Sequence, residues 1–277
     1  MTKEELEGLL QAYSADLRRE ELGGNTIKKY LSDAQRFLRS VPPEENMDKL
    51  TVIRFKEKLR IKYKPSSVNS YLMGANHFLI WAGHPELTVK TERLQRSFSR
   101  ECVLQQTEYR QLLAYARREG KDKYYYIMRT LAGTGIRVGE LRYITREVLE
   151  RRLAVIRHKG KIREICIPDS LCESLISYCE EQEIKSGPVF CGWQEGQALD
   201  ESGVWKTLKR LADKAGVDPE KVYPHSFRHL FAKIYMQQIG NLTELSDILG
   251  HSNIETTRLY TLETMEEKRV SLERLAL

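Results

Sequence analysis

Apolar residues in the first part of the chain recur at steps of three and four residues. The spacing holds from Leu6 to Leu17 and again from Ile27 to Leu38, and it is typical of amphipathic α-helices. Breaks at Gly23-Gly24-Asn25 and at Val41-Pro42-Pro43 separate these segments. We therefore expect residues 1–90 to form an all-α domain of four or five helices.

The last helix of this domain is expected to follow Lys64-Pro65-Ser66-Ser67 and to run through Trp81. Ser66 or Ser67 is the predicted cap, because a serine hydroxyl accepts a hydrogen bond from the first turn of a helix. After Gly83-His84-Pro85 the sequence becomes polar and basic, with few apolar residues to pack. Residues 91–103 are therefore predicted to be a linker between two domains.

A β-hairpin is predicted in the second half of the chain. Leu153–Arg157 and Arg163–Ile167 are rich in β-branched residues, and His158-Lys159-Gly160-Lys161 lies between them. Two such runs joined by a short turn are typical of antiparallel strands. We expect a small antiparallel sheet at this place.

Helical spacing surrounds the hairpin on both sides and indicates that residues 104–277 form a mixed, mainly α-helical domain. The expected helices are Thr107–Arg118, Lys123–Ala132, Ser170–Lys185, Ser202–Ala215, Ser226–Ile239, Leu242–Leu249, Ile254–Thr261 and Thr264–Leu275. The tail helix, residues 262–277, carries an apolar stripe that needs a surface to dock on. That surface is either its own domain or a neighbouring protomer, and the sequence leaves both alternatives open.

Composition indicates a globular protein without a membrane span. The chain has 277 residues, of which 41% are hydrophobic and 30% charged, which excludes a disordered or low-complexity chain. The most apolar stretch, Tyr71–Gly83, contains Asn76 and His77 and is too short to span a bilayer. No basic region followed by an apolar run marks a secretory leader, so we expect a cytoplasmic location. The five cysteines are expected to be reduced and mostly buried.

Positive charge suggests an anionic partner. The net charge is +6, and every second residue from Arg54 to Lys64 is basic. Such a row is either a solvated helix face or a surface that contacts phosphate. On the second interpretation, the phosphate-contacting residues of the row are Arg54, Lys58, Lys62 and Lys64.

Two histidines and an arginine converge on one face of a predicted helix. His225 and Arg228 are three residues apart, and His229 follows directly, so their side chains share one side of the helix. Two histidines four residues apart also suit a metal ion. The cationic Arg228 between them and the absence of a nearby carboxylate argue against it, and we predict neither a metal nor a cofactor.

These residues belong to a larger set, written TGIRVGEL, HKGKIR, PHSFRHLFA and LGHSNIETTRLYT. The order Arg, Lys, His-x-x-Arg, His, Tyr resembles the tyrosine recombinase family, also called the phage-integrase family. The resemblance covers Thr107 to about Thr261, and the steps from Arg228 to His251 and from His251 to Tyr260 match the family pattern. The helix that follows Lys64-Pro-Ser-Ser is similar to the helical, SAM-like core-binding domain of the family.

The resemblance implies a metal-free and ATP-free transesterification. In the family a tyrosine hydroxyl, here that of Tyr260, attacks a DNA phosphodiester, forms a 3′-phosphotyrosine and releases a 5′ hydroxyl. Arg137 and Arg228 would hold the non-bridging phosphate oxygens, because a guanidinium is always charged and offers a planar fork. His225 and His251 would add hydrogen bonds. His225 would also accept the proton of Tyr260, since a free phenol has a pKa of about 10.

The family's general acid is a lysine on the hairpin. Lys159 occupies the matching position, but the turn is one residue shorter than the family pattern, so Lys161 stays open as an alternative. Glu140 matches an acidic residue whose implied role is to orient Arg137 or a neighbouring group. His229 matches a frequent position and is expected to bond within the fold or to touch phosphate.

The resemblance also implies double-stranded DNA as the partner. The two domains of the family enclose the duplex, with basic linker residues on one side. The candidate for base recognition in this chain is the helix Ser66–Trp81, with Asn69 near its start. The implied assembly is a homotetramer on two duplexes with a specific crossover site, formed from a monomer or weak dimer and helped by accessory recombination proteins. The linker residues expected to contact DNA are Arg93, Arg96 and Arg100.

Three functions are compatible with the sequence at this point. A site-specific recombinase is the expected one, and its size is similar to short, two-domain Xer-like or mobile-element integrases. We expect a bacterial or mobile-element protein associated with the nucleoid. Chromosome-dimer resolution and element integration or excision both stay open. A type IB topoisomerase, or a DNA-binding relative without activity, is the alternative.

Overall fold

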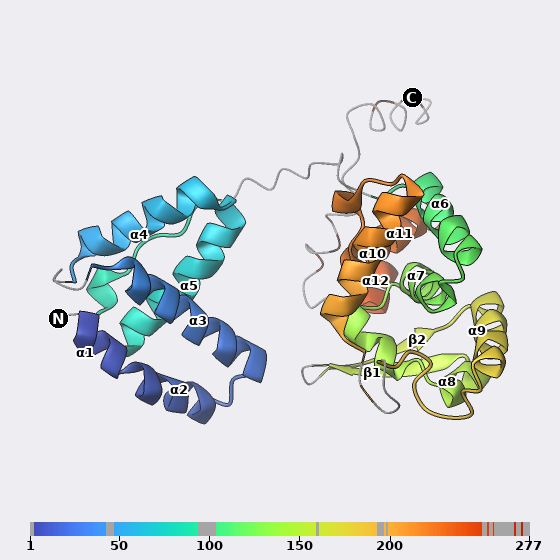
Figure 1. Ribbon diagram of the computed structural model, residues 1–277, viewed down its shortest axis with the longest axis horizontal. Helices are drawn as coiled ribbons and strands as arrows, with labels where there is room; N and C mark the ends of the chain where they lie inside the picture. The colour runs from blue at the N-terminus through green and yellow to red at the C-terminus, as the bar shows by residue number, and fades with distance from the viewer. Residues whose placement is uncertain are drawn as a thin grey trace. The chain divides into compact units, whose positions relative to one another are not determined.

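The computed structural model describes residues 3–42, 47–93, 104–158, 161–192, 197, 199–250, 254, 257, 269 and 273, with only the backbone of residues 158 and 161. The chain divides into two compact units, Met1–Ser97 and Phe98–Leu277 (Figure 1). Both units are built mainly of helices, as the sequence predicts. The predicted helices Ile254–Thr261 and Thr264–Leu275 lie outside the described residues as continuous segments.

The first unit is a helical bundle with its own hydrophobic core. The aromatic rings of Tyr13, Phe37 and Phe78 are fully buried in it, and Tyr13 meets Phe78 edge-on, a favourable arrangement for aromatic pairs. Its helices are α1 (Lys3–Gly8), α2 (Leu10–Arg19), α3 (Gly24–Ser40), α4 (Lys49–Lys62), α5 (Pro65–Trp81) and the 3-10 helix η1 (Pro85–Leu87).

The predicted serine cap of α5 is wrong. The helix begins at Pro65, and Lys64 occupies the N-cap without a side-chain hydrogen bond. Proline suits the first helical position because its fixed φ matches the helix and its missing N–H has no partner to lose there. Ser66 and Ser67 therefore lie inside the first turn.

Helices α3 and α5 cross at a glycine. A Cβ at Gly74 would lie 2.4 Å from both Cβ and Oδ2 of Asp33 on α3. Asp33 is 4% exposed, and Lys29 donates to its Oδ2 at 2.5 Å and to the carbonyl of Ser70 on α5 at 2.9 Å. Only glycine lets the two backbones approach to this distance.

Two asparagines of α5 hold the segment that follows η1, residues 88–93, which we call the strap. Asn76 donates to the carbonyl of Val89 at 2.8 Å and accepts from its N–H at 3.2 Å. Asn69, seven residues earlier and so on the same helix face, pairs with Glu92 in the same way at 2.9 Å and 2.6 Å. The strap is thereby fixed to the first unit through its backbone.

The second unit surrounds a larger core, to which residues such as Leu131, Ile136, Leu175 and Phe227 contribute fully buried side chains. Its elements are α6 (Gln106–Arg118), α7 (Asp122–Thr134), η3 (Val138–Tyr143), α8 (Arg146–Arg151), β1 (Leu153–His158), β2 (Lys161–Cys166), α9 (Asp169–Glu181), α10 (Glu201–Ala215), η4 (Pro219–Lys221), α11 (Pro224–Gln238) and α12 (Leu242–Leu249).

The predicted hairpin is confirmed. Strands β1 and β2 are antiparallel, with Leu153 opposite Cys166 and Ile156 opposite Arg163. Ala154, Ile156 and Ile165 are buried, so one face of the hairpin joins the core of the second unit. The neighbouring α8 has no counterpart in the predicted helices, because its six residues, REVLER, are too few to establish a helical period.

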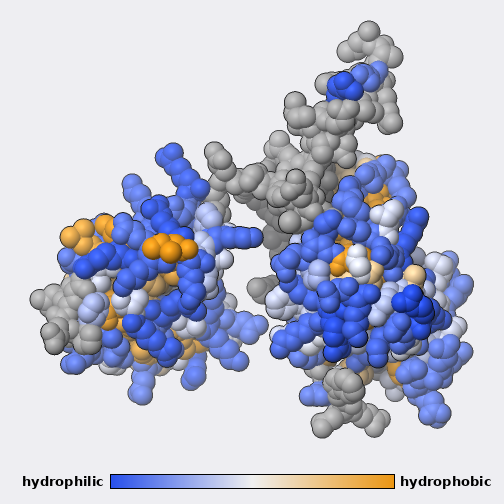
Figure 2. Space-filling view, turned by 45° about the horizontal axis from the view of Figure 1, so that its top comes forward, coloured by the Kyte–Doolittle hydropathy of each residue, from blue (hydrophilic) through white to orange (hydrophobic). Residues whose placement is uncertain are grey.

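Hydrophilic side chains cover most of the face drawn in Figure 2, and apolar residues form small separate patches on it. Within the described part of the chain, no helix is long and apolar enough to cross a membrane. Of the described cysteines, all free, Cys172 and Cys179 are buried, Cys191 is partly buried and Cys166 is exposed.

Candidate active site

The first part of the site is a tight turn after α7, which positions Arg137. The helix ends at Thr134, and Gly135 adopts the left-handed conformation with φ 65°, which glycine adopts without steric cost. A Cβ there would also lie 2.5 Å from a ring carbon of Phe231. The turn buries Ile136 and places Arg137 at the start of η3.

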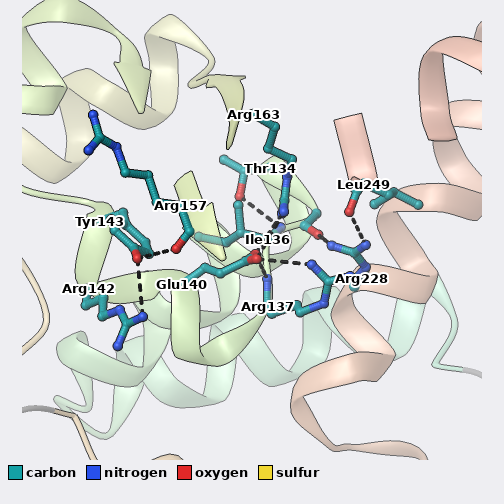
Figure 3. Close-up of polar contacts among 11 residues, drawn as sticks. Thr134, Ile136, Arg137, Glu140, Arg142, Tyr143, Arg157, Arg163, Arg228 and Leu249 are labelled. Atoms are coloured by element: carbon teal, nitrogen blue, oxygen red, sulfur yellow. Dashed lines mark hydrogen bonds and ion pairs between the residues drawn. The ribbon is translucent and has the colours of Figure 1, made fainter. Parts of the chain in front are cut away.

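Glu140 on η3 is a buried carboxylate that receives four hydrogen bonds (Figure 3). The backbone N–H and the Nη1 of Arg137 donate to it at 2.7 Å and 3.0 Å. Nη1 and Nη2 of Arg163 on β2 donate to its two oxygens at 3.1 Å and 2.7 Å. The predicted contact between Glu140 and Arg137 is therefore present, together with a second arginine that was not predicted.

These contacts keep Glu140 ionised. Burial alone would raise the pKa of Glu140, but the hydrogen bonds from Arg163 and Arg137 and the charges of both guanidinium groups outweigh burial and hold that pKa below its usual range. Only 3% of the Glu140 side chain is exposed, against 30% for Arg137. The carboxylate is hidden, while the arginine that it orients is partly open to solvent.

Arg228 on α11 connects the ends of two other helices. Its Nη1 donates to the carbonyl of Gly135 at 2.6 Å, and its Nη2 donates to the carbonyl of Leu249, the last residue of α12, at 2.5 Å (Figure 3). The residue is 2% exposed. Terminal helix carbonyls lack partners within their own helix, so a buried cation satisfies both and is itself fixed in orientation.

The two histidines of α11 are neutral at pH 7. Desolvation, followed by the positive charges of Arg228 and Arg137, lowers the pKa of His225. Burial, followed by the charges of His225 and Arg228, lowers the pKa of His229 to about 4. His225 remains exposed and His229 is partly buried. A neutral imidazole has a ring nitrogen that can accept a proton, and the positive charges of the two arginines oppose its protonation.

The structure brings four of the predicted site residues, Arg137, Glu140, His225 and Arg228, close to one another. The remaining predicted catalytic residues, Lys159, His251 and Tyr260, lie outside the described residues, as does the side chain of the alternative acid, Lys161. The last continuous described segment ends at Gly250, which ends α12 with φ 63° and directly precedes His251 in the sequence. Their roles stay predictions.

Arg163 is the site residue that the motifs did not predict. On an extended strand alternate residues share a face, so Arg163 lies on the same face as the buried Ile165, opposite Ile156 across the hairpin. A charged residue on the inner face of a strand needs a buried partner of opposite charge. That alternation was visible in the sequence and would have indicated a carboxylate nearby.

The residues in and around the basic row differ in their contacts, although their regular spacing suggests one uniform surface. Glu92 of the strap forms ion pairs with Lys56 and Arg60, the two members of the basic row that were not predicted to bind DNA. Asn69 uses its amide on the backbone of Glu92, in competition with a role in base recognition. Exposed residues of the predicted set are Arg54, Lys58, Lys62, Lys64, Ser66 and Arg93, whereas Arg96 and Arg100 lie outside the described residues.

Comparison with solved structures places the fold of this chain in a class. The chain has the fold of lambda integrase, as seen in one chain of a lambda integrase tetramer bound to a Holliday junction. The TM-score is 0.74, with 19% identity, and the match covers 92% of this chain and 76% of that one. It has the same fold as the Tn1549 transposon integrase in complex with transposon right-end DNA, with TM-score 0.71 and 17% identity, and each chain is covered completely. The fold is therefore that of the DNA integrases.

Sequence similarity narrows the class to a family. The family model described as "Phage integrase family" matches residues 102–267. Tyrosine recombinase XerA of Thermococcus onnurineus is 28% identical over 99% of this chain and 97% of its own length. The chain belongs to the phage integrase family, the tyrosine recombinases, and is an enzyme that cleaves and rejoins DNA strands.

Proposed function

We propose that the chain is a site-specific DNA recombinase that works through a 3′-phosphotyrosyl intermediate at Tyr260. The main support for the proposal is that Arg137, Arg228 and His225 lie together. The carboxylate beside them, that of Glu140, is already paired with arginine. Three guanidinium groups, those of Arg137, Arg163 and Arg228, share this region with the carboxylate of Glu140, and a second carboxylate, that of Glu201, acts on His225. The excess positive charge suits a phosphate whose oxygens gain negative charge during cleavage.

The cleavage step needs one proton acceptor and one proton donor. The Tyr260 oxygen forms a bond to phosphorus, its proton goes to the neutral His225, and the bond from phosphorus to the 5′ oxygen breaks. Lys159 gives a proton to that leaving oxygen, with Lys161 as the alternative donor. His251 adds a hydrogen bond to the phosphate. Religation is the reverse of this step with a 5′ hydroxyl from a partner duplex.

The proposed mechanism requires neither ATP nor a metal ion. The phosphotyrosine conserves the energy of the phosphodiester, so no nucleotide is consumed. A tyrosine hydroxyl replaces water as the nucleophile, so no metal-bound hydroxide has to be generated. Arginines provide the charge that a metal ion provides in other phosphoryl-transfer enzymes.

The proposed substrate is double-stranded DNA with a specific crossover site, bound by a homotetramer on two duplexes. The lambda integrase structure, a tetramer bound to a Holliday junction, supports this assembly. In the proposal residues 1–90 form the core-binding domain, 91–103 the basic linker and 104–277 the catalytic domain with its tail helix, in a cytoplasmic, nucleoid-associated protein. The exposed basic side chains of α4 would contact the DNA backbone.

The test is covalent capture of DNA. The protein is incubated with nicked duplexes whose central sequence is randomised, so that a cleaved fragment diffuses away and the protein stays attached. A DNA-linked protein band on a denaturing gel, enriched for one sequence, is expected in the presence of EDTA and absent for Tyr260→Phe. A band that survives in Tyr260→Phe would exclude this tyrosine as the nucleophile.

Two other results separate the alternative functions. Sequence-specific binding of the duplex without any covalent band would indicate an inactive DNA-binding relative. Relaxation of a supercoiled plasmid that lacks the enriched sequence would indicate a type IB topoisomerase, because that activity does not depend on a crossover site. The recombinase is expected to leave such a plasmid supercoiled.

A further inference from the structure

The buried carboxylate of Glu140 is shared by two arginines that engage it differently. Arg163 contacts both oxygens through two nitrogens, the bidentate arrangement that gives arginine–carboxylate pairs their strength and direction. The side chain of Arg137 contacts Glu140 through Nη1 alone at 3.0 Å, and its backbone N–H completes the set. Arg163 is therefore the principal counter-ion of Glu140.

This division of contacts affects the charge that Arg137 presents. A buried carboxylate without a second cation would draw the whole guanidinium of Arg137 toward itself, because a buried charge is stabilised only by a close partner. With Arg163 in place, the negative charge of Glu140 is already compensated. Arg137 is oriented by one hydrogen bond and keeps its positive charge for an anion.

Arg163 also lies against the end of α12. A Cβ on Gly250 would lie 2.8 Å from both Cδ and Nη1 of Arg163 and 3.1 Å from its Nε. Glycine at position 250 thus lets the guanidinium pack against the backbone, and its positive φ ends the helix at the same point. One side chain on the hairpin strand β2 joins η3 to the residue that precedes His251.

We propose that Arg163 is a positioning residue for strand cleavage, an inference that rests on the proposed recombinase function. It fixes the carboxylate of Glu140, leaves Arg137 free to hold phosphate, and aligns the hairpin that carries Lys159 and Lys161 with the end of α12. It touches no reacting atom. Its removal slows cleavage of bound DNA and leaves DNA affinity almost unchanged.

The experiment measures the rate of covalent complex formation on the duplex enriched by the capture assay, at protein concentrations that saturate binding. The variants are Arg163→Met, Arg163→Lys, Glu140→Met and the double variant Arg163→Met/Glu140→Met. Arg157→Met is the matched control, because it removes one cation from the neighbouring strand β1, where the residue is exposed and its side chain points away from Glu140 (Figure 3). DNA affinity is measured separately by fluorescence anisotropy.

Arg163→Met is expected to slow cleavage by about 10–100-fold, the range typical for residues that orient a catalytic group, with DNA affinity equal to that of Arg157→Met. Arg163→Lys keeps the charge without the bidentate geometry and should recover part of the rate.

The double variant should be no slower than the slower single variant, because Arg137 then has no carboxylate competing for it. It also replaces both buried partners with apolar groups, which folded proteins tolerate better than one unpaired charge. It therefore keeps the test valid if Arg163→Met does not fold.

Two outcomes overturn the inference while the proposed function stands. In one, wild-type protein and Arg163→Met form covalent complexes at the same rate. In the other, the rate losses of Arg163→Met and Glu140→Met multiply in the double variant, which would show that the two residues act independently. If wild-type protein forms no covalent complex, the proposed function fails and the inference falls with it.

Discussion

Replacing Arg228 with lysine tests the site geometry most directly. Arg228 is buried and joins the carbonyl of Gly135 to that of Leu249 through two different nitrogens. Lysine preserves the charge but has one nitrogen at the end of a flexible stem, so it cannot reproduce a fork that spans two carbonyls. The variant separates the effect of geometry from the effect of charge.

The expected loss follows from the two contacts. A hydrogen bond from a charged group contributes about 1.5–3 kcal/mol, so losing one of the two should lower the free energy of unfolding by about 1.5–3 kcal/mol. Losing both in Arg228→Met should lower it by about 3–6 kcal/mol on the same basis. In the proposed mechanism Arg228 also donates to the phosphate, so cleavage by Arg228→Lys should fall by about 10²–10³-fold, as for the loss of one donor to a developing oxyanion.

Hydrogen exchange followed by mass spectrometry measures the stability, because it reports on peptides of α7 and α11 separately from those of the first unit. Arg210→Lys, an exposed residue of α10, is the matched control and is expected to change stability by no more than about 0.5 kcal/mol. If Arg228→Lys exchanges like this control, the two carbonyl contacts contribute no stability, and the account of how Arg228 is oriented is refuted.

Two further predictions concern the packing of α3 on α5 and the ionisation of Glu140. Gly74→Ala should destabilise the first unit by about 1–3 kcal/mol in hydrogen exchange, because its methyl group would overlap Asp33. The control Gly24→Ala, where no atom lies within 4 Å of the added Cβ, should be tolerated. Equal stability of the two variants would contradict the close crossing of α3 and α5. Glu140→Gln should cost about 3–5 kcal/mol at neutral pH. The folded-state pKa of Glu140 is depressed, so its stabilisation is present above the unfolded pKa of about 4.3 and is lost as pH falls. The difference from wild type measured by hydrogen exchange should therefore shrink below about pH 4, and a constant difference would show that the ionised carboxylate is not responsible.

Periodicity predicted the helical elements and the hairpin because long amphipathic segments carry a strong signal. α12 has the predicted bounds, and α3 and α11 differ from prediction by a few residues. The short α8 was missed because six residues do not define a period. The cap of α5 was predicted wrongly because the helix begins at Pro65, which suits the first helical position and leaves Ser66 and Ser67 inside the first turn.

Motif spacing predicted that Arg137, Glu140, His225 and Arg228 belong to one site, and the structure brings these four together. It did not predict Arg163, because that residue acts through a contact between segments far apart in the sequence rather than through a motif. It also did not predict that Lys56 and Arg60 pair with Glu92, since a row of alternating charges looks the same whether or not a distant carboxylate neutralises part of it.

The strap has a consequence for which residues of the first unit can vary in sequence. Asn69 and Asn76 contact only the peptide groups of Glu92 and Val89, so the pairing itself does not depend on which side chains stand at 89 and 92. Burial of Val89 restricts one of these positions, but the exposed residues of the strap can be exchanged without losing the pairing. Substitutions at its exposed positions Lys90, Thr91 and Arg93 can therefore accumulate as long as the two asparagines are retained, so the strap specifies a backbone path on the first unit rather than an amino-acid sequence.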